Sequence, residues 1–404
     1  MTKWQEVKLG DVCDLIAGFA FKSKDFGNYP DKVIKITNIE PPFVNMANLI
    51  GVDISKYNRD KLKKFLATKG DYVLAMTGAT IGKLGRIYQD EAYINQRVLM
   101  FKAKKDTNQY FLYYVLSSYN FSQYILKHID SESAQANISA NTVGKYIFSL
   151  PPLEEQKKIA GVLGALDDKI ELNNKINQNL ESQAQVLFKS WFVDFEPFGG
   201  KMPDDWKIKT IGDVCASISE TYNRKDENVV LINTSDVLNG EILTHTLVKN
   251  ENLKGQFKKT FQKNDILYSE IRPINKRFAF VDIENTYNYI ASTKLMVIRP
   301  DTSKISPLIL YRILKSQDLI DELQHLAETR SGTFPQITFA SELAIQKIVL
   351  APLNEQKRIS NVLEVLENKI RKNIQENLRL AELRDALLPK LMSGEINVDD
   401  VKID

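Results

Sequence analysis

The stretch Pro151–Phe195 reads PPLEEQKKIAGVLGALDDKIELNNKINQNLESQAQVLFKSWFVDF. It begins with a proline pair, has no proline in its interior and carries apolar residues at helical spacing. This heptad-like stripe predicts an amphipathic helix of about 40 residues, roughly 60 Å long. A helix of that length needs a partner along its apolar stripe, because isolated helices are only marginally stable in water.

The partner is predicted in the same chain. Ala351–Leu391 reads APLNEQKRISNVLEVLENKIRKNIQENLRLAELRDALLPKL and aligns with the first stretch at an offset of 200 residues. Two copies of one helical pattern on a single chain most simply pack about a pseudo-twofold axis. We therefore expect two long antiparallel helices that form an intramolecular coiled coil.

The internal repeat extends beyond the helices. Trp4–Cys13 resembles Trp206–Cys215 at an offset of 202 residues, and the segments between these ends and the helices diverge. Divergence inside a shared frame predicts one scaffold that carries two different binding surfaces. The expected domains are residues 1–150, a central spacer helix over 151–198, a second domain over 199–350, and a C-terminal spacer helix and tail over 351–404.

Each globular half is predicted to contain short strands followed by a helix, which indicates α+β modules. The first half offers strands at Val33–Thr37, Asp71–Met76, Leu84–Tyr88 and Val98–Ala103, and a helix at Asn108–His128. The second offers strands at Val229–Asn233, Asp265–Ser269, Phe278–Val281 and Leu295–Ile298, and a helix at Ser306–Ala327. The fold class is thus two α/β-type globules joined to two long helices.

Three details of the helices are open to test. Pro389 is expected to break the second helical pattern at Leu388, since proline lacks the backbone N–H that a helix interior uses. Asn173 and Asn373 fall on the two apolar stripes. Each is either a buried seam residue that sets the helix register or a solvated residue at the seam edge.

The composition is that of an ordinary globular protein, with 43% apolar and 26% charged residues and a net charge of +3. No run of 18 apolar residues exists and the N-terminus lacks a signal-peptide core, so a cytoplasmic protein without membrane contact is expected. Cys13 and Cys215 both follow a Gly-Asp-Val triplet. They are interpreted as equivalent packed positions, and no Cys/His spacing suggests a metal site.

Two motifs resemble catalytic or nucleotide-binding sites without meeting their requirements. Glu40–Phe43 is near the Asn/Asp-Pro-Pro-Tyr/Phe motif of amino-methyltransferases, but no Gly-rich loop precedes it to hold a methyl donor. Thr77–Leu84 resembles a phosphate loop but is one residue short and has Leu84 where Ser or Thr is required. The three histidines are scattered. The absence of an active-site pattern favours a binding or scaffold protein.

The polar residues best suited to contact DNA lie where the two halves diverge. Arg matches guanine and Asn or Gln matches adenine, whereas Lys and Ser/Thr mostly hold phosphates. The first half offers Lys22, Lys24, Thr77, Lys83, Arg86, Asn95, Gln96, Arg97, Gln135 and Asn137. The second half offers Asn223, Arg224, Lys225, Arg272, Asn275, Lys276, Arg277, Thr333 and Gln336. Arg272–Arg277 is the densest group, in one predicted hairpin; for each residue singly, a solvated surface position is the alternative.

Several segments together resemble the specificity subunit of type I restriction–modification systems. The resemblance is carried by Leu150–Gln156 with its counterpart Leu350–Gln356, by Phe188–Phe195, and by Leu388–Ile396. It covers the whole chain and includes the duplicated architecture.

The resemblance implies a non-catalytic subunit with two target recognition domains, each of which reads half of a split, asymmetric DNA sequence. It implies that the long helices space the half-sites and dock two methyltransferase subunits, with restriction subunits bound through them. Glu155, Gln156, Glu355 and Gln356, in the matching segments, are the expected docking residues. S-adenosylmethionine, ATP and Mg are expected on the partner subunits, with no cofactor or metal in this chain.

Two other classes of function stay open from the sequence. One is an adenine methyltransferase-like enzyme fused to a coiled coil, with Glu40–Phe43 as its site; binding of S-adenosylmethionine by the chain alone would favour it. The other is a protein–protein adaptor that never touches DNA.

Overall fold

The computed structural model describes residues 4–130, 136–250 and 255–401. The chain forms two compact units. The first unit comprises Met1–Asn174 and Ile374–Asp404, and the second comprises Lys175–Asn373. Each unit therefore contains one globular domain and a segment of both long helices. Within the described ranges, no helix is long and apolar enough to cross a membrane.

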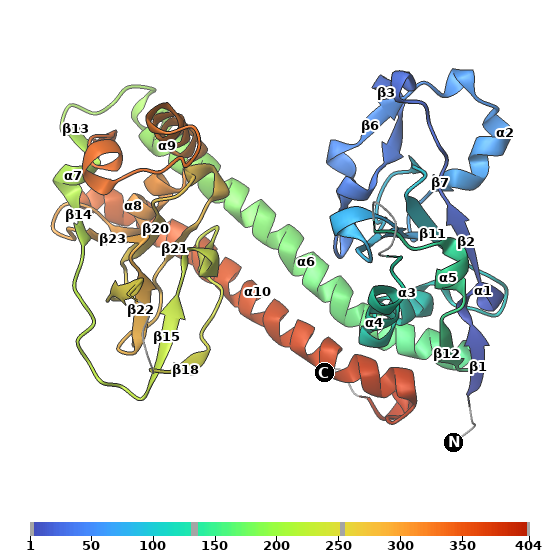
Figure 1. The fold of residues 1–404 in the computed structure, drawn as a ribbon. Coiled ribbons are helices and arrows are strands. Elements are labelled where there is room, and N and C mark those ends of the chain that lie inside the picture. Colours follow the sequence, from blue (N-terminus) through green and yellow to red (C-terminus); the bar gives the residue numbers. More distant parts are fainter. Residues whose placement is uncertain (1–3, 131–135, 251–254, 402–404) are drawn as a thin grey trace. The chain divides into compact units, whose positions relative to one another are not determined.

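The two predicted long helices are present (Figure 1). α6 spans Leu153–Phe192 and α10 spans Leu353–Ser393. The predicted break at Pro389 is wrong, because α10 continues through this residue to Ser393. Pro389 is exposed, and it lies in the last turn and a half of the helix. The carbonyl that it leaves without a helical partner is therefore close to solvent.

The helices run antiparallel within each unit. In the first unit, Asn173 of α6 donates a hydrogen bond to Asn377 of α10 at 2.9 Å. In the second unit, Asn373 of α10 donates to Asn177 of α6 at 2.8 Å. Asn173 and Asn373 are each 1% exposed, so the structure places both in the seam and not at its edge. The paired asparagines satisfy one another, and Asn173 also donates to Glu376 of α10 at 2.8 Å. Buried polar pairs of this kind set the register of packed helices.

The globular domain of the first unit consists of two packed sheets and a two-stranded ribbon. The ribbon pairs β1 with β12. The larger sheet has the order β2-β11-β8-β9-β5-β4 and the smaller one β6-β3-β10-β7. Their bounds are β1 Gln5–Lys8, β2 Cys13–Ala17, β3 Phe26–Ile34, β4 Ile39–Glu40, β5 Phe43–Val44, β6 Ile50–Val52, β7 Leu66–Ala67, β8 Tyr72–Ala75, β9 Leu84–Arg86, β10 Ala92–Ile94, β11 Val98–Ala103 and β12 Ile147–Leu150.

Alternation along the buried strands divides the core of this domain. Tyr72 and Leu74 of β8 pack in one cluster with helices α3 (Gln109–Ser117) and α4 (Tyr119–Lys127) and with α6. Val73 and Ala75 pack in the other cluster, against residues of the smaller sheet. Because successive side chains of a strand point to opposite faces, one strand serves both clusters. The long helix is thus part of the core of the domain.

The second unit repeats this plan. Its ribbon pairs β13 with β24, and its sheets have the orders β14-β23-β20-β21 and β18-β15-β22-β19, with β16-β17 as a short hairpin. The bounds are β13 Lys207–Thr210, β14 Cys215–Ile218, β15 Asn228–Ile232, β16 Val237–Leu238, β17 Glu241–Ile242, β18 Leu247–Lys249, β19 Phe257–Lys259, β20 Ile266–Ser269, β21 Phe278–Phe280, β22 Tyr289–Ser292, β23 Leu295–Pro300 and β24 Lys347–Leu350. Ile266 and Tyr268 pack with helices α8 (Pro307–Leu314) and α9 (Gln317–Arg330), and Leu267 packs against the other sheet.

The single helix predicted after the strands is wrong in both halves, because each is two helices. Ser118 adopts an extended conformation between α3 and α4, and its hydroxyl accepts a hydrogen bond from Phe121 N–H at 3.2 Å. Ser316 is extended at the equivalent position between α8 and α9. The Ser118 hydroxyl thus satisfies a free N–H of α4 at the change of direction. Ser316 makes no such bond to α9, and its hydroxyl donates to the Ile313 carbonyl at 2.8 Å.

The two cysteines occupy the equivalent packed positions that the repeat predicted. Cys13 begins β2 and Cys215 begins β14, and both thiols are free and buried. Burial raises the pKa of each thiol to about 12. Both thiols are therefore protonated at neutral pH, as expected of structural cysteines.

Candidate nucleic-acid interface

A loop of identical length and bonding connects two strands in each unit. In the first unit it joins β8 to β9, and Ala75 N–H donates to the Lys83 carbonyl at 3.0 Å. In the second unit it joins β20 to β21, and Ser269 N–H donates to the Arg277 carbonyl at 2.8 Å. The predicted hairpin over Arg272–Arg277 is confirmed. Lys83 and Arg277 thus occupy the same position of two equivalent hairpins.

Two further segments are bonded to each hairpin. In the first unit, Met76 N–H donates to the Arg97 carbonyl at 3.0 Å, and Gly78 N–H donates to the Ala136 carbonyl at 3.1 Å. These bonds bring Asn95–Arg97 and Asn137 to the hairpin. Three segments that are distant in the sequence therefore present their polar side chains at one edge of the first domain.

The second unit builds the same arrangement. Glu270 N–H donates to the Lys294 carbonyl and Arg272 N–H to the Pro335 carbonyl, both at 3.1 Å. Gln336, which forms a bridge with Ile271, is the counterpart of Asn137. The exposed Lys294, which the sequence interpretation did not select, is the counterpart of Arg97. We define these two sets of segments as the hairpin edges of the two units.

The hairpins differ at the two positions that need a left-handed backbone. In the first unit these are Gly78 and Gly82, with φ of 70° and 83°. In the second unit the corresponding residues, at an offset of 194, are Arg272 and Lys276, with φ of 44° and 53°. Glycine adopts this conformation without penalty, whereas a residue with a Cβ is strained by about 1 kcal/mol or more. The second unit thus has basic side chains, Arg272 and Lys276, in a strained backbone conformation, and the first unit avoids this strain with glycine.

The hairpin edges are rich in donors, and each also carries one carboxylate: Asp130 is bridged to Asn137, and Glu270 pairs with Lys294 at 3.4 Å. Lys83, Gln96 and Arg97 are exposed in the first unit, as are Arg272 and Asn275 in the second. Thr333, also exposed, follows α9 on the segment that carries Gln336. Arg277 is half-buried, and its guanidinium donates to the Ser235 carbonyl at 3.0 Å. Such an edge suits a polyanion, because Lys and Arg bind phosphates and Arg, Asn and Gln also match base edges.

Two predicted contact residues have structural roles instead. Thr77 is 3% exposed, so its side chain cannot reach a ligand, and its carbonyl accepts a hydrogen bond from Thr80. Arg86 lies in β9 with its guanidinium 3.6 Å from Glu171 and 3.9 Å from Asp168, both on α6. It joins the sheet to the helix. Gln135 lies outside the described residues.

A second group of predicted residues precedes the first strand of the smaller sheet in each unit. Lys22 and Lys24 precede β3, and this loop is braced by a 2.5 Å hydrogen bond from the Tyr57 hydroxyl to Asp25. That bond, with a second one from Lys56, holds the pKa of Asp25 below its usual value. The hairpin edges and these loops are therefore two separate candidate contact regions within each unit.

The equivalent loop of the second unit contains Asn223, Arg224 and Lys225. Tyr222 donates to Asp226 at 2.6 Å, and burial followed by this bond raises the pKa of Tyr222 to about 12. A tyrosine–aspartate bond thus braces the loop here as in the first unit. Asn223 and Lys225 are exposed, so their side chains are free to meet a ligand.

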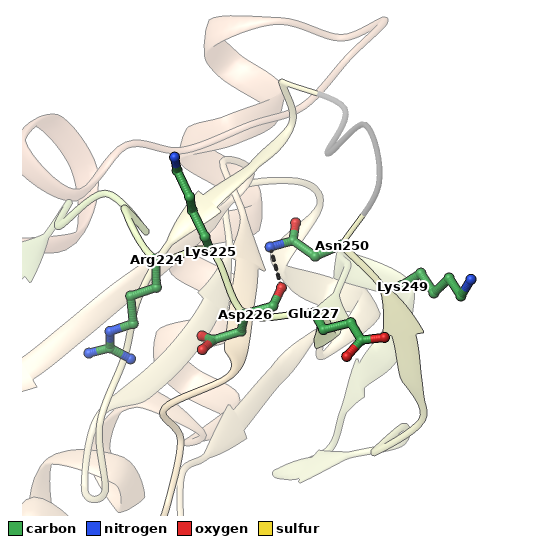
Figure 2. Close-up of a pocket in the computed structure, with 6 residues that line it drawn as sticks. All are labelled: Arg224, Lys225, Asp226, Glu227, Lys249 and Asn250. Atoms are coloured by element: carbon green, nitrogen blue, oxygen red, sulfur yellow. Dashed lines mark hydrogen bonds between the residues drawn. The ribbon is translucent and has the colours of Figure 1, made fainter.

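A pocket of about 440 Å³ lies beside this loop (Figure 2). It is lined by Arg224, Lys225, Asp226, Glu227, Lys249 and Asn250. Asn250 donates to the Asp226 carbonyl at 2.8 Å, and Arg224 lies 3.7 Å from the centre of the Tyr287 ring. In Figure 2 the Lys225 side chain points away from the carboxylates of Asp226 and Glu227. The mixed charge of the lining does not favour a small anion.

The four expected docking residues divide into two kinds. Gln156 is 1% exposed, accepts a hydrogen bond from Asn108 N–H at 2.8 Å and donates to the Pro151 carbonyl at 2.8 Å. Gln356 is also 1% exposed and accepts from Ser306 N–H at 2.8 Å. Both amides fasten a long helix to its own domain, so docking by Gln156 and Gln356 is corrected to a structural role.

The two glutamates predicted to dock a partner have bonding partners within their own units. Glu155 accepts a hydrogen bond from the Trp4 indole at 3.2 Å, and Glu355 pairs with Arg358 at 2.8 Å. Both carboxylates are half-buried. Their predicted docking role stays a prediction.

The motif over Glu40–Phe43 forms a tight hairpin between β4 and β5. Glu40 accepts two hydrogen bonds from the Asn45 amide, and the Pro42 carbonyl accepts one from Arg86 N–H. This arrangement gives the motif a structural function as the turn of a sheet edge. In the described part of the chain, no group of three His, Cys, Asp or Glu residues could hold a metal ion.

Comparison with known proteins gives a consistent result. The model of the type I restriction modification DNA specificity domain matches residues 1–182 and 203–380. The chain belongs to this family. The type I restriction enzyme HindI specificity subunit of Haemophilus influenzae is 41% identical over 184 residues, which is 45% of this chain and 40% of that subunit. The MjaIX specificity subunit of Methanocaldococcus jannaschii is 28% identical over 309 residues, or 72% of this chain and 70% of the relative.

The fold of the family is also recognisable in a solved structure. The crystal structure of a type I restriction–modification S subunit from M. genitalium has a TM-score of 0.61 and 16% sequence identity. The match covers 96% of both chains. The duplicated α+β architecture with two long helices is therefore the fold of specificity subunits.

Proposed function

We propose that the chain is the non-catalytic DNA-reading subunit of a type I restriction–modification complex. Each globular domain reads one half of a bipartite, asymmetric DNA target. The helices α6 and α10 space the two half-sites and dock two methyltransferase subunits. The restriction subunits bind through those methyltransferases. S-adenosylmethionine, ATP and Mg belong to the partner subunits, and the complex acts on cytoplasmic DNA.

The observation that carries the proposal is the pair of hairpin edges. The same backbone hydrogen bonds hold the same three segments together in both units, but the side chains on them differ. Lys83, Gln96 and Asn137 in the first unit correspond to Arg277, Thr293 and Gln336 in the second. A shared backbone with different donors and acceptors is what two readers of different half-sites require.

Exchange of residues 1–150 for the corresponding domain of another specificity subunit tests the proposal. The methylated adenines of a host genome should then show one altered half-site and one unchanged half-site. The unaltered chain provides the control. Alteration of both half-sites, or of neither, would contradict independent reading by the two domains.

A second measurement addresses the division of labour between subunits. The isolated chain should bind DNA weakly, with an affinity that falls steeply as salt rises, because Lys and Arg release counterions from phosphates. Specific binding should require the methyltransferase subunits. Binding of S-adenosylmethionine by the isolated chain would contradict the non-catalytic assignment, and absence of DNA binding by the full complex at every salt concentration would favour an adaptor.

A further inference from the structure

Two large apolar side chains are exposed on the hairpin edge of the second unit. Ile274 is 45% exposed and lies at the turn of the hairpin, in the short helix Pro273–Asn275. Phe334 is 49% exposed and lies on the segment that follows α9. Their exposed neighbours in the sequence are basic or polar, namely Arg272, Asn275 and Thr333. This edge therefore combines apolar surface with cations and hydrogen-bond donors.

Hydrogen bonds fix the backbone on which the two apolar side chains are carried. Ile274 N–H donates to the Gln324 side chain of α9 at 3.2 Å. The bond from Arg272 N–H to the Pro335 carbonyl, at 3.1 Å, joins the hairpin to the residue that follows Phe334. The turn and the Phe334 segment are thus attached to each other, and the turn is attached to a helix. A ligand that covers these side chains pays little for ordering their backbone.

The hairpin edge of the first unit lacks this apolar surface. The counterpart of Ile274, at an offset of 194, is Thr80, and the counterpart of Phe334, at an offset of 199, is Gln135. The described residues of the first hairpin edge include no exposed large apolar side chain. The apolar pair is therefore not part of the duplicated frame. It belongs to what distinguishes the second reader from the first.

The polar surroundings restrict what can cover the apolar pair. Arg272 and Asn275 lie on the same turn as Ile274, and both are exposed, so a partner must be anionic or rich in acceptors and must also present an apolar group. In the major groove of DNA, thymine presents a C5-methyl group beside its O4 acceptor, whereas the code of the other three bases consists of donors and acceptors. Phe and other apolar side chains are suited to contact with this methyl group.

We propose that Ile274 and Phe334 select a thymine in the half-site of the second unit by packing against its C5-methyl group. The inference rests on the proposed function, which brings DNA to the hairpin edge. It deepens that function by naming one base and the side chains that select it. Arg272 and Asn275 on the same turn have the donors and acceptors that suit neighbouring base edges.

Replacement of thymine by deoxyuridine tests the proposal, because it removes the methyl group and leaves base pairing unchanged. The full complex, with its methyltransferase subunits, is titrated against labelled target DNA in which the thymines are replaced one at a time. Fluorescence anisotropy at fixed salt gives the Kd. The exchange of residues 1–150 described above identifies the half-site of the second unit. We expect one replacement in that half-site to weaken binding roughly 4-fold, the effect of one buried methyl group.

Variants of the apolar pair show whether these side chains cause the loss. The double variant Ile274→Ala, Phe334→Ala should bind the thymine and deoxyuridine DNAs equally. Phe334→Leu keeps an apolar side chain and should still discriminate between them. Ile208→Ala, which removes a 61% exposed apolar side chain from β13, outside the hairpin edge, is the matched control and should behave as the unaltered chain. Replacements in the other half-site should have the same effect in every variant.

Two results would overturn the proposal and leave the proposed function intact. One is equal binding of thymine and deoxyuridine by the unaltered complex at every position of the second half-site. The other is a loss on replacement that persists undiminished in the double variant, because another residue would then contact the methyl group. A domain exchange that alters both half-sites or neither would instead contradict the proposed function, whatever the response to deoxyuridine.

Discussion

The two units join domain to helix in different ways at equivalent positions. In the first unit, the Tyr114 hydroxyl donates to Asp167 of α6 at 2.7 Å, and Arg384 of α10 donates to the other oxygen of Asp167 at 2.8 Å. In the second unit, the counterpart of Tyr114 is Arg312, which is 3% exposed. The first junction therefore centres on one carboxylate.

The second junction is a larger charged cluster. Arg312 donates to Glu367 of α10, and to Glu181 of α6 at 2.8 Å. Lys315 also donates to Glu181, at 3.0 Å. The end of α10 thus supplies a cation, Arg384, to the first junction, whereas the end of α6 supplies a carboxylate, Glu181, to the second. If the two helix ends were exchanged, Glu181 would meet Asp167 and Arg384 would meet Arg312 and Lys315. Like charges would then repel, so each domain favours its own helix end.

The hairpin edges differ in a similar way. The first unit has glycine at both left-handed positions, and the second has Arg272 and Lys276. By contrast, the contacts of Gln156 and Gln356 are the same in both units. The contacts that fasten each long helix to its domain are therefore duplicated, whereas the residues of the junctions and the hairpin edges differ between the units.

The largest expected effect comes from the charged junction of the second unit. Glu367→Gln removes a carboxylate from Arg312, which is buried and keeps its charge. We expect a loss of about 3 kcal/mol in the free energy of unfolding, the low end for removal of one partner from a buried ion pair. The loss is at the low end because Arg312 keeps its bond to Glu181 at 2.8 Å. Tyr114→Phe in the first unit removes one hydrogen bond to a carboxylate and should cost only about 1.5–3 kcal/mol.

Hydrogen exchange in urea, measured on peptides from each unit, checks both variants, since two units need not unfold in one step. The effect of Glu367→Gln should be confined to peptides of the second unit. Equal losses from Glu367→Gln and Tyr114→Phe would show that the two junctions contribute alike, and the comparison would fail at this point.

The glutamine clamps should respond equally in the two units. Gln156→Leu and Gln356→Leu each leave a buried backbone N–H, that of Asn108 or Ser306, without an acceptor. We expect each variant to lose about 1–3 kcal/mol, the cost of an unsatisfied buried donor. Gln→Glu substitutions at the same positions keep the acceptor oxygen but lose the amide that donates to the Pro151 or Ala351 carbonyl, so they should also destabilise their units. A large difference between Gln156→Leu and Gln356→Leu would contradict a duplicated frame.

The sequence predicted the duplicated helices and strands better than it predicted the contacts of individual polar side chains. The internal repeat predicted both helices and their antiparallel pairing at an offset of 200 residues, and the matched positions of Cys13 and Cys215 at an offset of 202. The hairpin over Arg272–Arg277 followed from the strand patterns on either side of it. These features depend on local periodicity, which a sequence displays directly.

The errors arose where a distant segment decides the outcome. Gln156 occupies a polar position of a heptad pattern, and only the backbone of Asn108 explains its burial. Arg86 is an ordinary basic strand residue until α6 places Glu171 beside it. Apolar spacing continues through Ser118, so the change of direction between α3 and α4 left no signal in the pattern. Such contacts join residues 48 or more positions apart, which no local pattern records.

Replacement of the strained residues tests the divergence of the hairpins. Arg272→Gly and Lys276→Gly restore the glycine pattern of the first unit, so each should stabilise the second unit by about 1 kcal/mol. The same variants remove cations from the proposed DNA contact and should weaken binding of the full complex to its target by roughly 10-fold each. Gain of stability with loss of affinity is the signature of strain retained for function.

Two results would separate strain from function in this experiment. Arg272→Ala keeps the strained backbone and removes the charge, so it should lose affinity without gaining stability. DNA affinity that is unchanged in Arg272→Gly, Lys276→Gly and Arg272→Ala would exclude these side chains from the contact. The measurements are urea unfolding by hydrogen exchange and fluorescence anisotropy of labelled DNA at fixed salt.

The smallest expected effect is a difference in acid sensitivity at the junctions. Burial alone would raise the pKa of Glu181, but Lys315 and Arg312 outweigh it and hold this pKa below its ordinary value. A carboxyl whose pKa is lower in the folded state stabilises the fold above its unfolded pKa, about 4.3, and loses that contribution as pH falls through the folded value. Glu181→Gln should therefore destabilise the second unit by about 1 kcal/mol near pH 7.

The unaltered chain and Glu181→Gln should converge in stability as the pH falls through the lowered pKa of Glu181, because Glu181 itself is neutral below it. The first junction has Arg384 of α10 in place of this carboxylate, and an arginine carries its charge throughout this range. Glu382→Gln, at an exposed position of α10, is the matched control and should leave the pH profile of either unit unchanged. A constant gap between the unaltered chain and Glu181→Gln from pH 7 to pH 3 would mean that Glu181 acts through packing and not through its charge.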